Sequence, residues 1–234
     1  MGTEVATLAN SRDDIHLLGG YDKCLSQKNK YSVYNNYEEI FEKPDVIIDF
    51  SSPEATIELL NFAIDKKIPV VIATTGFNNE QKEFIIKCSK KIPIFHSSNM
   101  SFEINLMKNI SSYLAENLKD AEIEIVETHH SRKKDAPSGT ALMIAEAIQN
   151  SQNNSFHYNY DRFKNSQKRD PKEIGFSSIR GGNIVGEHTV IFFKENEVFE
   201  VTHKALSRNI FAEGAINAAE FILNKPCGYY TSQL

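Results

Sequence analysis

The chain has 234 residues and a mass of 26.5 kDa, which is long for one compact domain and suits two small ones. Apolar residues make up 41% and charged residues 24% of it, a composition that can bury an ordinary core and that excludes a disordered chain. Its net charge of −5 argues against a nucleic-acid partner. Its apolar runs are shorter than the ~18 residues that a membrane span needs. We therefore expect a cytoplasmic globular protein that binds neither nucleic acid nor a membrane.

The first hundred residues predict a parallel sheet flanked by helices. Short β-rich runs alternate there with helical segments, in the order 46–50, 53–66, 69–73, 79–91 and 93–96. Uninterrupted apolar runs of this length are typical of parallel strands that helices cover on both faces. Upstream, we predict a helix over residues 2–10 and a strand over 15–18 that ends at Gly19 and Gly20, which continues the same α/β alternation.

From about residue 101 the pattern changes to that of a second, mixed domain. A helix is predicted over 102–118, and residues 121–128 alternate apolar and acidic side chains as in a half-exposed strand. A helix over 139–149 and a long polar loop over 150–167 are predicted next. Three strands follow over 176–179, 188–193 and 198–203, and the last two are joined as a hairpin. The closing helix, 209–223, has no strands of its own nearby, so we expect it to return to the first domain.

The densest polar segment is residues 129–140, HHSRKKDAPSGT, between a predicted strand end and a helix start. The last three residues place free backbone N–H groups at a helix N-terminus, which suits an anion. His129 can donate a proton near neutral pH, and Lys133 carries a compact positive charge. One interpretation is therefore an acid beside a carboxylate clamp. The other is a solvated basic loop that merely caps the helix, and composition leaves both open.

Residues 127–141 also resemble the signature loop of the 4-hydroxy-tetrahydrodipicolinate (dihydrodipicolinate) reductase family, E-x-H-H-x-x-K-x-D-A-P-S-G-T-A. Five shorter motifs of that family occur in family order, namely DFS from Asp49, TTGF from Thr74, SIRGG from Ser178, VGEHTV from Val185 and THKA from Thr202. The resemblance covers nearly the whole chain. It implies an NADH- or NADPH-dependent enzyme of lysine and diaminopimelate synthesis.

The resemblance also implies residue roles. His129 would be the proton donor and Lys133 a second catalytic cation. The substrate, a small cyclic dicarboxylate, would be held by His130, Ser138, Gly139 and Thr140. The implied reaction is hydride delivery to C4 of the unsaturated ring and protonation of the resulting enamine carbon by His129, which gives tetrahydrodipicolinate without a metal.

For the cofactor, the resemblance points to loops that follow predicted parallel strands, where such folds bind ligands. These residues are Met1, Gly2, Asp22, Lys23, Ala73, Thr74, Thr75, Ser97, Ser98, Asn99 and Met100. Asp22 would accept hydrogen bonds from ribose hydroxyls, which favours NADH, whereas Lys23 could pair with a 2′-phosphate and admit NADPH. We expect both cofactors to be used. Taken alone, Asp22 could be a turn residue and Asn99 a helix cap.

The chain departs from the family at its start. The family opens with a strand and a G-x-x-G-x-M-G loop that cradles the pyrophosphate, whereas this sequence begins at Met1 and Gly2, the tail of that motif. Such a strand is central in a doubly wound sheet, and its loss would remove several buried side chains. We therefore expect the natural protein to start further upstream.

The spacing of the cysteines and histidines predicts neither a metal site nor a disulfide. The three cysteines are far apart and form no C-x-x-C pair, so we expect structural thiols at Cys24, Cys88 and Cys227. The other histidines lack ligand-spaced partners, and we expect packing or surface roles for His16, His96, His157, His188 and His203.

Together these features predict a two-domain α/β enzyme. Residues 1–100, completed by the closing segment 207–234, would form a Rossmann-like, doubly wound dinucleotide-binding domain that lacks its first strand. Residues 101–206 would form a smaller α+β domain for substrate binding and for assembly into the homotetramer that the resemblance implies. Two alternatives stay open: another small Rossmann dehydrogenase of amino-acid metabolism, and a cofactor-incompetent paralogue that keeps the dicarboxylate pocket.

Overall fold

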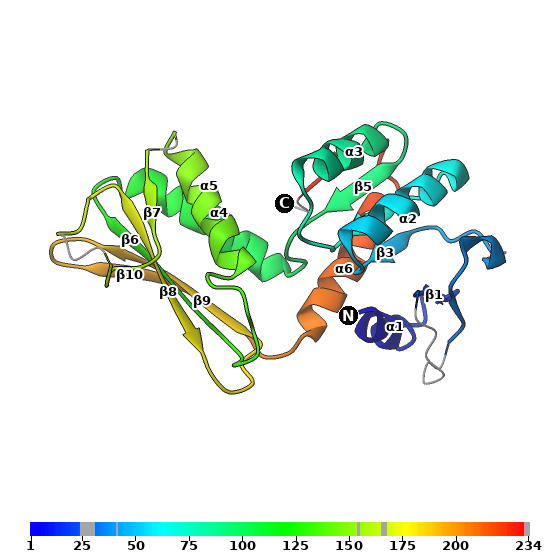
Figure 1. Cartoon of the computed structure of the whole chain (residues 1–234), viewed down its shortest axis with the longest axis horizontal. Helices are drawn as coiled ribbons and strands as arrows, with labels where there is room; N and C mark the ends of the chain where they lie inside the picture. Colours follow the sequence, from blue (N-terminus) through cyan, green and yellow to red (C-terminus); the bar gives the residue numbers. More distant parts are fainter. Residues whose placement is uncertain (24–30, 41, 154, 165–167, 232–234) are drawn as a thin grey trace. The chain divides into compact units, whose positions relative to one another are not determined.

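The computed structural model describes residues 1–23, 31–40, 42–153, 155–164 and 168–231, and the chain divides into two compact units (Figure 1). The first unit comprises Met1–Ser101 and Arg208–Leu234, and the second comprises Phe102–Ser207. The chain thus leaves the first unit after Ser101 and returns to it at Arg208. In the described residues, no helix is long and apolar enough to span a bilayer.

The first unit is built on a four-stranded parallel sheet with the strand order β11-β5-β4-β3. Its strands are β3 (Ile47–Asp49), β4 (Val70–Ile72), β5 (Pro93–His96) and β11 (Gly228–Tyr230). The helices of the unit are α1 (Gly2–Ala9), α2 (Pro53–Lys66), α3 (Asn79–Ser89) and α6 (Asn209–Ile222), with a short 3-10 turn η1 (Tyr37–Glu39). This arrangement confirms the predicted α/β class.

Both faces of this sheet are buried, and β4 shows why its sequence lacks polar alternation. Val70 and Ile72 pack into the cluster that contains residues of α2 and α3, whereas Val71 packs on the other face with residues of α6. All three side chains are fully buried. The uninterrupted apolar run therefore has one helical layer on each side, as a doubly wound sheet requires.

Local signals fix the helices that follow these strands. The Ser52 side chain caps α2 by accepting from the Ala55 N–H at 3.4 Å, and Pro53 occupies the first position of the helix. Asn78 and Gln81 form a reciprocal capping box at the start of α3. These boundaries agree with the predicted helix starts.

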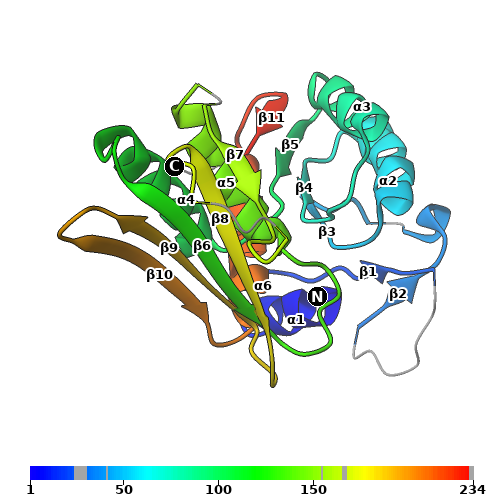
Figure 2. The ribbon, with the colours of Figure 1, turned by 60° about the vertical axis from the view of Figure 1, so that its left-hand side comes forward.

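Three predictions for short strands are wrong. The first strand lies at Gly20–Tyr21 (β1) instead of 15–18, and it pairs in parallel with Val33–Tyr34 (β2) in a sheet separate from the main one (Figure 2). The closing segment carries a strand after all, because β11 pairs with β5. Part of the expected loop 150–167 is strand β7 (His157–Asn159), which pairs with β8. Residues 154 and 165–167 of that loop, like Cys24, lie outside the described residues.

The second unit is a five-stranded mixed sheet with the order β10-β9-β6-β8-β7. Its longer strands are β6 (Glu122–His129), β8 (Glu173–Arg180), β9 (Gly186–Phe193) and β10 (Val198–Ala205). Helices α4 (Phe102–Asn117) and α5 (Gly139–Ser151) lie against one face of it (Figure 1). On that face the register aligns Ile174, Ile123 and Phe192 in one row across β8, β6 and β9, and these side chains are almost fully buried.

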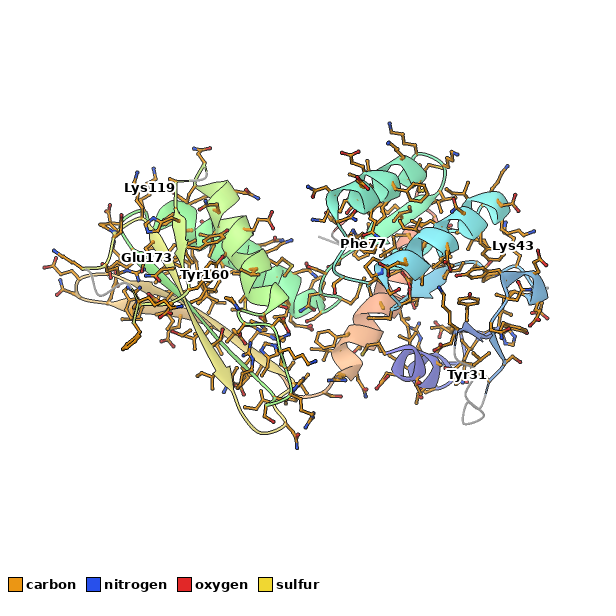
Figure 3. The ribbon with its side chains drawn as sticks, viewed as in Figure 1. Tyr31, Lys43, Phe77, Lys119, Tyr160 and Glu173 are labelled. Atoms are coloured by element: carbon orange, nitrogen blue, oxygen red, sulfur yellow. The ribbon has the colours of Figure 1, made fainter. Side chains whose placement is uncertain are left out.

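A network of charges holds the loop after β7 to the other face of the sheet. Arg162 and Arg169 both reach the carboxylates of Glu124 on β6 and of Glu173 on β8. Figure 3 labels Glu173 in the second unit. Arg169 also donates to the backbone oxygen of Ile123 at 2.8 Å. These contacts provide hydrogen-bond partners for the carboxylate of Glu173, which is 5% exposed, and they hold the loop after β7 to the sheet.

The glycine of α6 sets how closely that helix approaches the chain before α4. A Cβ on Gly214 would overlap the backbone oxygen of Met100. We expect Gly214→Ala to lower the free energy of unfolding by about 1–3 kcal/mol, because backbone must move to make room. Urea unfolding followed by circular dichroism measures this. Gly2→Ala is the control, since no atom lies within 4 Å of its Cβ position, and an equal loss in both variants would contradict the prediction.

Candidate active site

One end of the second sheet changes from apolar to polar on the face that the helices cover. Along β6 the buried side chains are Ile123 and Ile125, and then Glu127 and His129. The register places Ser178 and His188 beside Glu127, and Arg180 beside His129. The apolar rows therefore end in two polar rows, which bring together side chains from three strands.

Glu127 lies at the centre of this polar end and is 1% exposed. Its carboxylate accepts two hydrogen bonds from Arg180, at 2.8 and 2.7 Å, and one from the Ser138 N–H at 3.2 Å. The fourth contact is the Nδ1 atom of His129, at 2.5 Å. Burial alone would raise the pKa of Glu127, but the hydrogen bonds from Arg180, Ser178 and His129 outweigh it and lower this pKa to about 2.

His129 is 8% exposed and carries the only ring nitrogen, among the described residues, that contacts Glu127. Its other ring nitrogen, Nε2, lies over Gly186, where a Cβ would come within 3.0 Å of it. Burial lowers the pKa of His129, and the positive charges of Lys133 and Arg180 act in the same direction, while Glu127 opposes them. Glu127 is therefore the neighbour that favours the protonated ring, against burial and the two positive charges.

His188 closes the cluster on the side of β9. Its ring lies edge-on to that of His129, with centroids 5.1 Å apart, and its Nε2 lies 2.9 Å from the Ser138 hydroxyl. Burial and the charge of His129 lower the pKa of His188 to about 3, so it is neutral at neutral pH. We expected a packing or surface residue here. The residue is buried, but it also contacts two of the candidate site residues.

The loop after β6 is held in place by short contacts. The His130 N–H donates to the backbone oxygen of Ile184 at 2.8 Å, and Lys133 forms an ion pair with Asp135 at 2.8 Å. The Nδ1 atom of His130 is buried without a hydrogen-bond partner in the described part of the chain. The loop therefore carries a fixed lysine charge and one unsatisfied imidazole nitrogen.

The start of α5 is capped by Ser138, as one of the two interpretations of the sequence had it, and its first turn suits an anion, as the other had it. The Ser138 hydroxyl caps the helix by accepting from the Ala141 N–H at 3.2 Å, and its own N–H donates to Glu127. Gly139 is exposed at the first helical position and Thr140 is partly buried. The first turn of an α-helix has N–H groups without intrahelical acceptors, which suits an anion there.

In the first unit, a second buried carboxylate ties together the loops that follow β3 and β4. Asp49 accepts from the hydroxyls of Ser51, Thr56 and Thr74, at 2.5, 2.5 and 3.0 Å. Thr74 in turn accepts from the Ser51 N–H at 2.9 Å. Thr75 follows on the surface, and Ala73 is partly buried. These residues form one edge of the sheet at the carboxyl ends of its strands.

The loop after β5 lies at the same edge. The Ser97 N–H donates to the backbone oxygen of Ile72 at 3.2 Å, which joins this loop to β4. The Asn99 side chain accepts from the Ser101 N–H at 2.9 Å, a contact within the turn before α4. Ser98 is exposed and Met100 is buried.

The remaining expected cofactor residues lie on other elements of the first unit. Met1 precedes α1 and Gly2 begins it, and the terminal amine pairs with Glu4 at 3.2 Å. Asp22 follows β1 on the two-stranded sheet, and its N–H donates to the backbone oxygen of Tyr34. Lys23 pairs with Glu58 of α2 at 3.2 Å.

Comparison with protein families shows to which family the chain belongs. The model of the N-terminal part of dihydrodipicolinate reductase matches residues 1–100, and that of its C-terminal part matches residues 103–233. The chain belongs to the dihydrodipicolinate reductase family. Curated relatives agree: a 4-hydroxy-tetrahydrodipicolinate reductase of Caldanaerobacter subterraneus is 45% identical over 100% of this chain and 92% of its own. That of Clostridium novyi is 43% identical over 99% and 92%.

Solved structures share the fold. A dipicolinate-bound dihydrodipicolinate reductase from Paenisporosarcina sp. TG-14 superposes with a TM-score of 0.80 at 22% identity, covering 99% of this chain and 93% of that one. The diaminopimelate (DAP) dehydrogenase of C. glutamicum superposes with a TM-score of 0.59 at 12% identity, covering 98% and 89%. The alternative of another small Rossmann dehydrogenase is not favoured, because both family models and the curated relatives agree on the reductase.

Sequence reasoning missed three residues of the polar cluster. Glu127 and Arg180 stood inside recognised motifs without an assigned role, and His188 was assigned to packing or the surface. The spacing of Glu127 and His129 was an available signal, since residues two apart on a strand lie on the same face. Nothing in the sequence paired Arg180 with Glu127, because they lie 53 residues apart.

The depressed pKa of Glu127 predicts acid sensitivity. Its folded value of about 2 lies below the unfolded value of 4.5, so the stabilisation is complete above pH 4.5 and is lost as the pH falls toward 2. We expect the unfolding free energy to lose about 2 kcal/mol from this group by pH 3. Arg180→Gln should flatten this dependence in urea unfolding across pH 7 to 3.

The matched control for this measurement is Arg132→Gln. Arg132 is exposed and donates to the Asn183 side chain at 3.1 Å, away from Glu127. This variant should keep the pH slope of the unaltered protein. Parallel stability curves for the unaltered protein and Arg180→Gln would rule out Glu127 as the source of the acid sensitivity.

Proposed function

We propose that the protein is a cytoplasmic enzyme that reduces 4-hydroxy-tetrahydrodipicolinate to tetrahydrodipicolinate with NADH or NADPH, in lysine and diaminopimelate biosynthesis. The observation that carries this proposal is the buried Glu127–His129 pair beside Lys133 and the start of α5. Such an arrangement offers a proton donor next to a site for carboxylates. The names of the curated relatives support the same activity.

The substrate is proposed to bind through its two carboxylates. Lys133, His130 and the first-turn N–H groups of Gly139 and Thr140 are the proposed contacts. The unsatisfied Nδ1 atom of His130 supports this, because a buried polar atom without a partner is costly unless a ligand completes it, and in the tautomer with a hydrogen on Nδ1 it would donate to a carboxylate. The Ser138 hydroxyl is engaged by His188 and the Ala141 N–H, so its contribution is to hold the helix start. The solved relative described as dipicolinate-bound supports a small cyclic dicarboxylate.

His129 is proposed to supply the proton that completes the reaction. The 4-hydroxyl group of the substrate leaves as water to give the unsaturated ring, and the nicotinamide cofactor, when bound, would supply the hydride to C4 of that ring. The enamine carbon that results needs one proton. Because Glu127 contacts the Nδ1 atom of His129, the other ring nitrogen, Nε2, is proposed to deliver that proton. Lys133 contributes positive charge against the substrate carboxylate, and Asp135 fixes its position.

The first unit is proposed to bind the cofactor at the carboxyl edge of its parallel sheet. Thr75 and Ser98 offer exposed hydroxyls that suit ribose and carboxamide groups. The Thr74 and Ser97 hydroxyls are engaged by Asp49 and by the Asn99 backbone oxygen, so Thr74, Ser97 and Asn99 are proposed to hold the loops in place. Ala73 and Met100 flank these loops, and Met1 and Gly2 are proposed at the pyrophosphate. Metal ligation has no comparable support, since the described residues contain no cluster of three ligand-type side chains.

Use of both NADH and NADPH is part of the proposal. Asp22 suits the ribose hydroxyls, and Lys23 would pair with a 2′-phosphate. Lys23 is bound to Glu58 at 3.2 Å, but both side chains are more than half exposed. Exposed ion pairs contribute little, so Lys23 can exchange this partner for a phosphate at small cost.

A homotetramer is proposed to form through the face of the second sheet opposite α4 and α5, outside the part at Glu124 and Glu173 to which the loop after β7 is held. That face carries apolar side chains without a helix over them, on β6, β8, β9 and β10: Val126, Ile179, Ile191, Phe193 and Val198. Ile179 and Val198 are about half exposed. Apolar side chains clustered on an uncovered sheet face are typical of subunit contacts.

The reductase proposal predicts distinct effects for the two proposed catalytic residues. Oxidation of NADH and of NADPH, followed optically with freshly generated substrate, should proceed with the unaltered protein. His129→Gln should lower kcat by about 10²–10⁴-fold, because the proton donor is removed. Lys133→Ala should raise KM at least about 10-fold, because a charged contact to substrate is lost.

Lys134→Ala is the matched control for Lys133→Ala. Lys134 is the exposed neighbour on the same loop, and its removal should leave both kinetic constants within about 2-fold. Undiminished turnover in His129→Gln and Lys133→Ala would refute the assignment of these residues. Absence of turnover in the unaltered protein with either cofactor would refute the reductase proposal.

The assembly proposal predicts sedimentation of the unaltered protein at about four times 26.5 kDa. Ile179→Glu should shift it to a smaller species, because a charge would be buried in the subunit contact. Tyr113→Glu is the control, since Tyr113 is 65% exposed on α4 and away from this face. A monomeric unaltered protein, or an unchanged Ile179→Glu variant, would contradict the proposal.

A further inference from the structure

The carboxylate of Glu127 uses both of its oxygens fully. Oε1 accepts from Arg180 and from the Ser138 N–H, and Oε2 accepts from Arg180 and faces Nδ1 of His129. These donors come from β8, from the start of α5 and from β6 itself. The carboxylate can therefore neither rotate nor shift without breaking a bond to a buried group.

This geometry determines which nitrogen of His129 carries the mobile proton. Because Glu127 stays ionised, its Oε2 is an acceptor, so the Nδ1 atom at 2.5 Å must carry a hydrogen and donate it. The proton that comes and goes is then on Nε2. That nitrogen lies over Gly186, the one position of the row without a side chain, where a Cβ would come within 3.0 Å of it.

We propose that Glu127 is a positioning residue that fixes the ring orientation and tautomer of His129, so that Nε2 delivers the catalytic proton. Arg180 and the Ser138 N–H hold Glu127 for this purpose, and Gly186 leaves room at Nε2. This inference rests on the function proposed above for His129. It deepens that proposal by assigning to Glu127 the control of the His129 tautomer.

The charges around His129 support a need for such a partner. Burial, Lys133 and Arg180 all disfavour the imidazolium, and His188 adds a neutral ring beside it. Asp135 on the same loop pairs with Lys133. Glu127 is thus the anion in direct contact with the ring, and its hydrogen bond and charge oppose the lowering of the pKa of His129.

The competing interpretation is purely structural, with Glu127 serving only to neutralise Arg180 between β6 and β8. Glu127→Gln separates the two. Oε1 faces two donors that cannot become acceptors, Arg180 and the Ser138 N–H, whereas Oε2 faces one such donor, Arg180, and the His129 ring, whose tautomer can change. The amide oxygen should therefore take the place of Oε1, and the amide NH₂ should face His129. The NH₂ group would then donate to Nδ1, which forces the hydrogen onto Nε2 and opposes the imidazolium.

The first test is nitrogen NMR of the His129 ring in the protein without substrate, across pH 5 to 9. The unaltered protein should show a protonated Nδ1 and a titrating Nε2. Glu127→Gln should move the neutral hydrogen to Nε2 and lower the pKa of the ring by at least about one unit, which is a tenfold change in protonation. An unprotonated Nδ1 in the unaltered protein overturns the inference without any variant.

Kinetics provide the second readout. Glu127→Gln should lower kcat about 10-fold or more at neutral pH, leave KM within about 3-fold, and move the alkaline limb of the pH profile of kcat to lower pH. Glu127→Asp should recover part of the lost kcat, because it restores a carboxylate. A variant with unchanged kcat and an unchanged pH profile overturns the inference.

Glu124→Gln is the matched control, because Glu124 is also an arginine-bound carboxylate of β6 but faces the other side of the strand. It should leave the His129 titration and the pH profile unchanged; an equal shift in both variants overturns the inference. If the unaltered protein lacks turnover while its NMR titration depends on Glu127, the reductase proposal fails and the positioning role stands.

Discussion

The buried carboxylate of Glu127 is the group on which the polar end of the second sheet depends. An isolated charge at 1% exposure would be strongly destabilising, so its position requires donors on all sides. Arg180, His129 and the Ser138 N–H provide them, and each comes from a different element. The same contacts that make the charge tolerable bring the strand ends and the start of α5 together.

The first unit repeats this principle with a different outcome. Asp49 is also a buried carboxylate, but its partners are the hydroxyls of Ser51, Thr56 and Thr74. These are neutral donors on the loops after β3 and β4 and on α2. The network shapes a loop edge and places no ring nitrogen beside the charge. In the first unit the buried carboxylate of Asp49 thus arranges loops, whereas in the second unit the buried carboxylate of Glu127 contacts a titratable imidazole.

Much of the fold follows from local sequence, because its signals act within a few residues. The caps at Ser52 and Asn78 place helix starts, and the apolar run of β4 predicts a strand buried on both faces. Where this reasoning failed, the deciding contact was distant. Strands β7 and β11 have weak local patterns and exist because they pair with β8 and β5, and β1 pairs with β2 in a sheet of its own.

The sequence by itself determined the family, the kinds of group available to the candidate site and the order in which they occur. A signature loop of contiguous residues carries that information, and its chemistry does not depend on the rest of the chain. The tertiary structure decided which groups meet. Arg180 and His188 reach Glu127 through the register of β8 and β9 against β6, and register depends on the pairing of whole strands. No local pattern encodes that pairing, so only the folded chain shows that Arg180 and His188 lie beside Glu127 and His129.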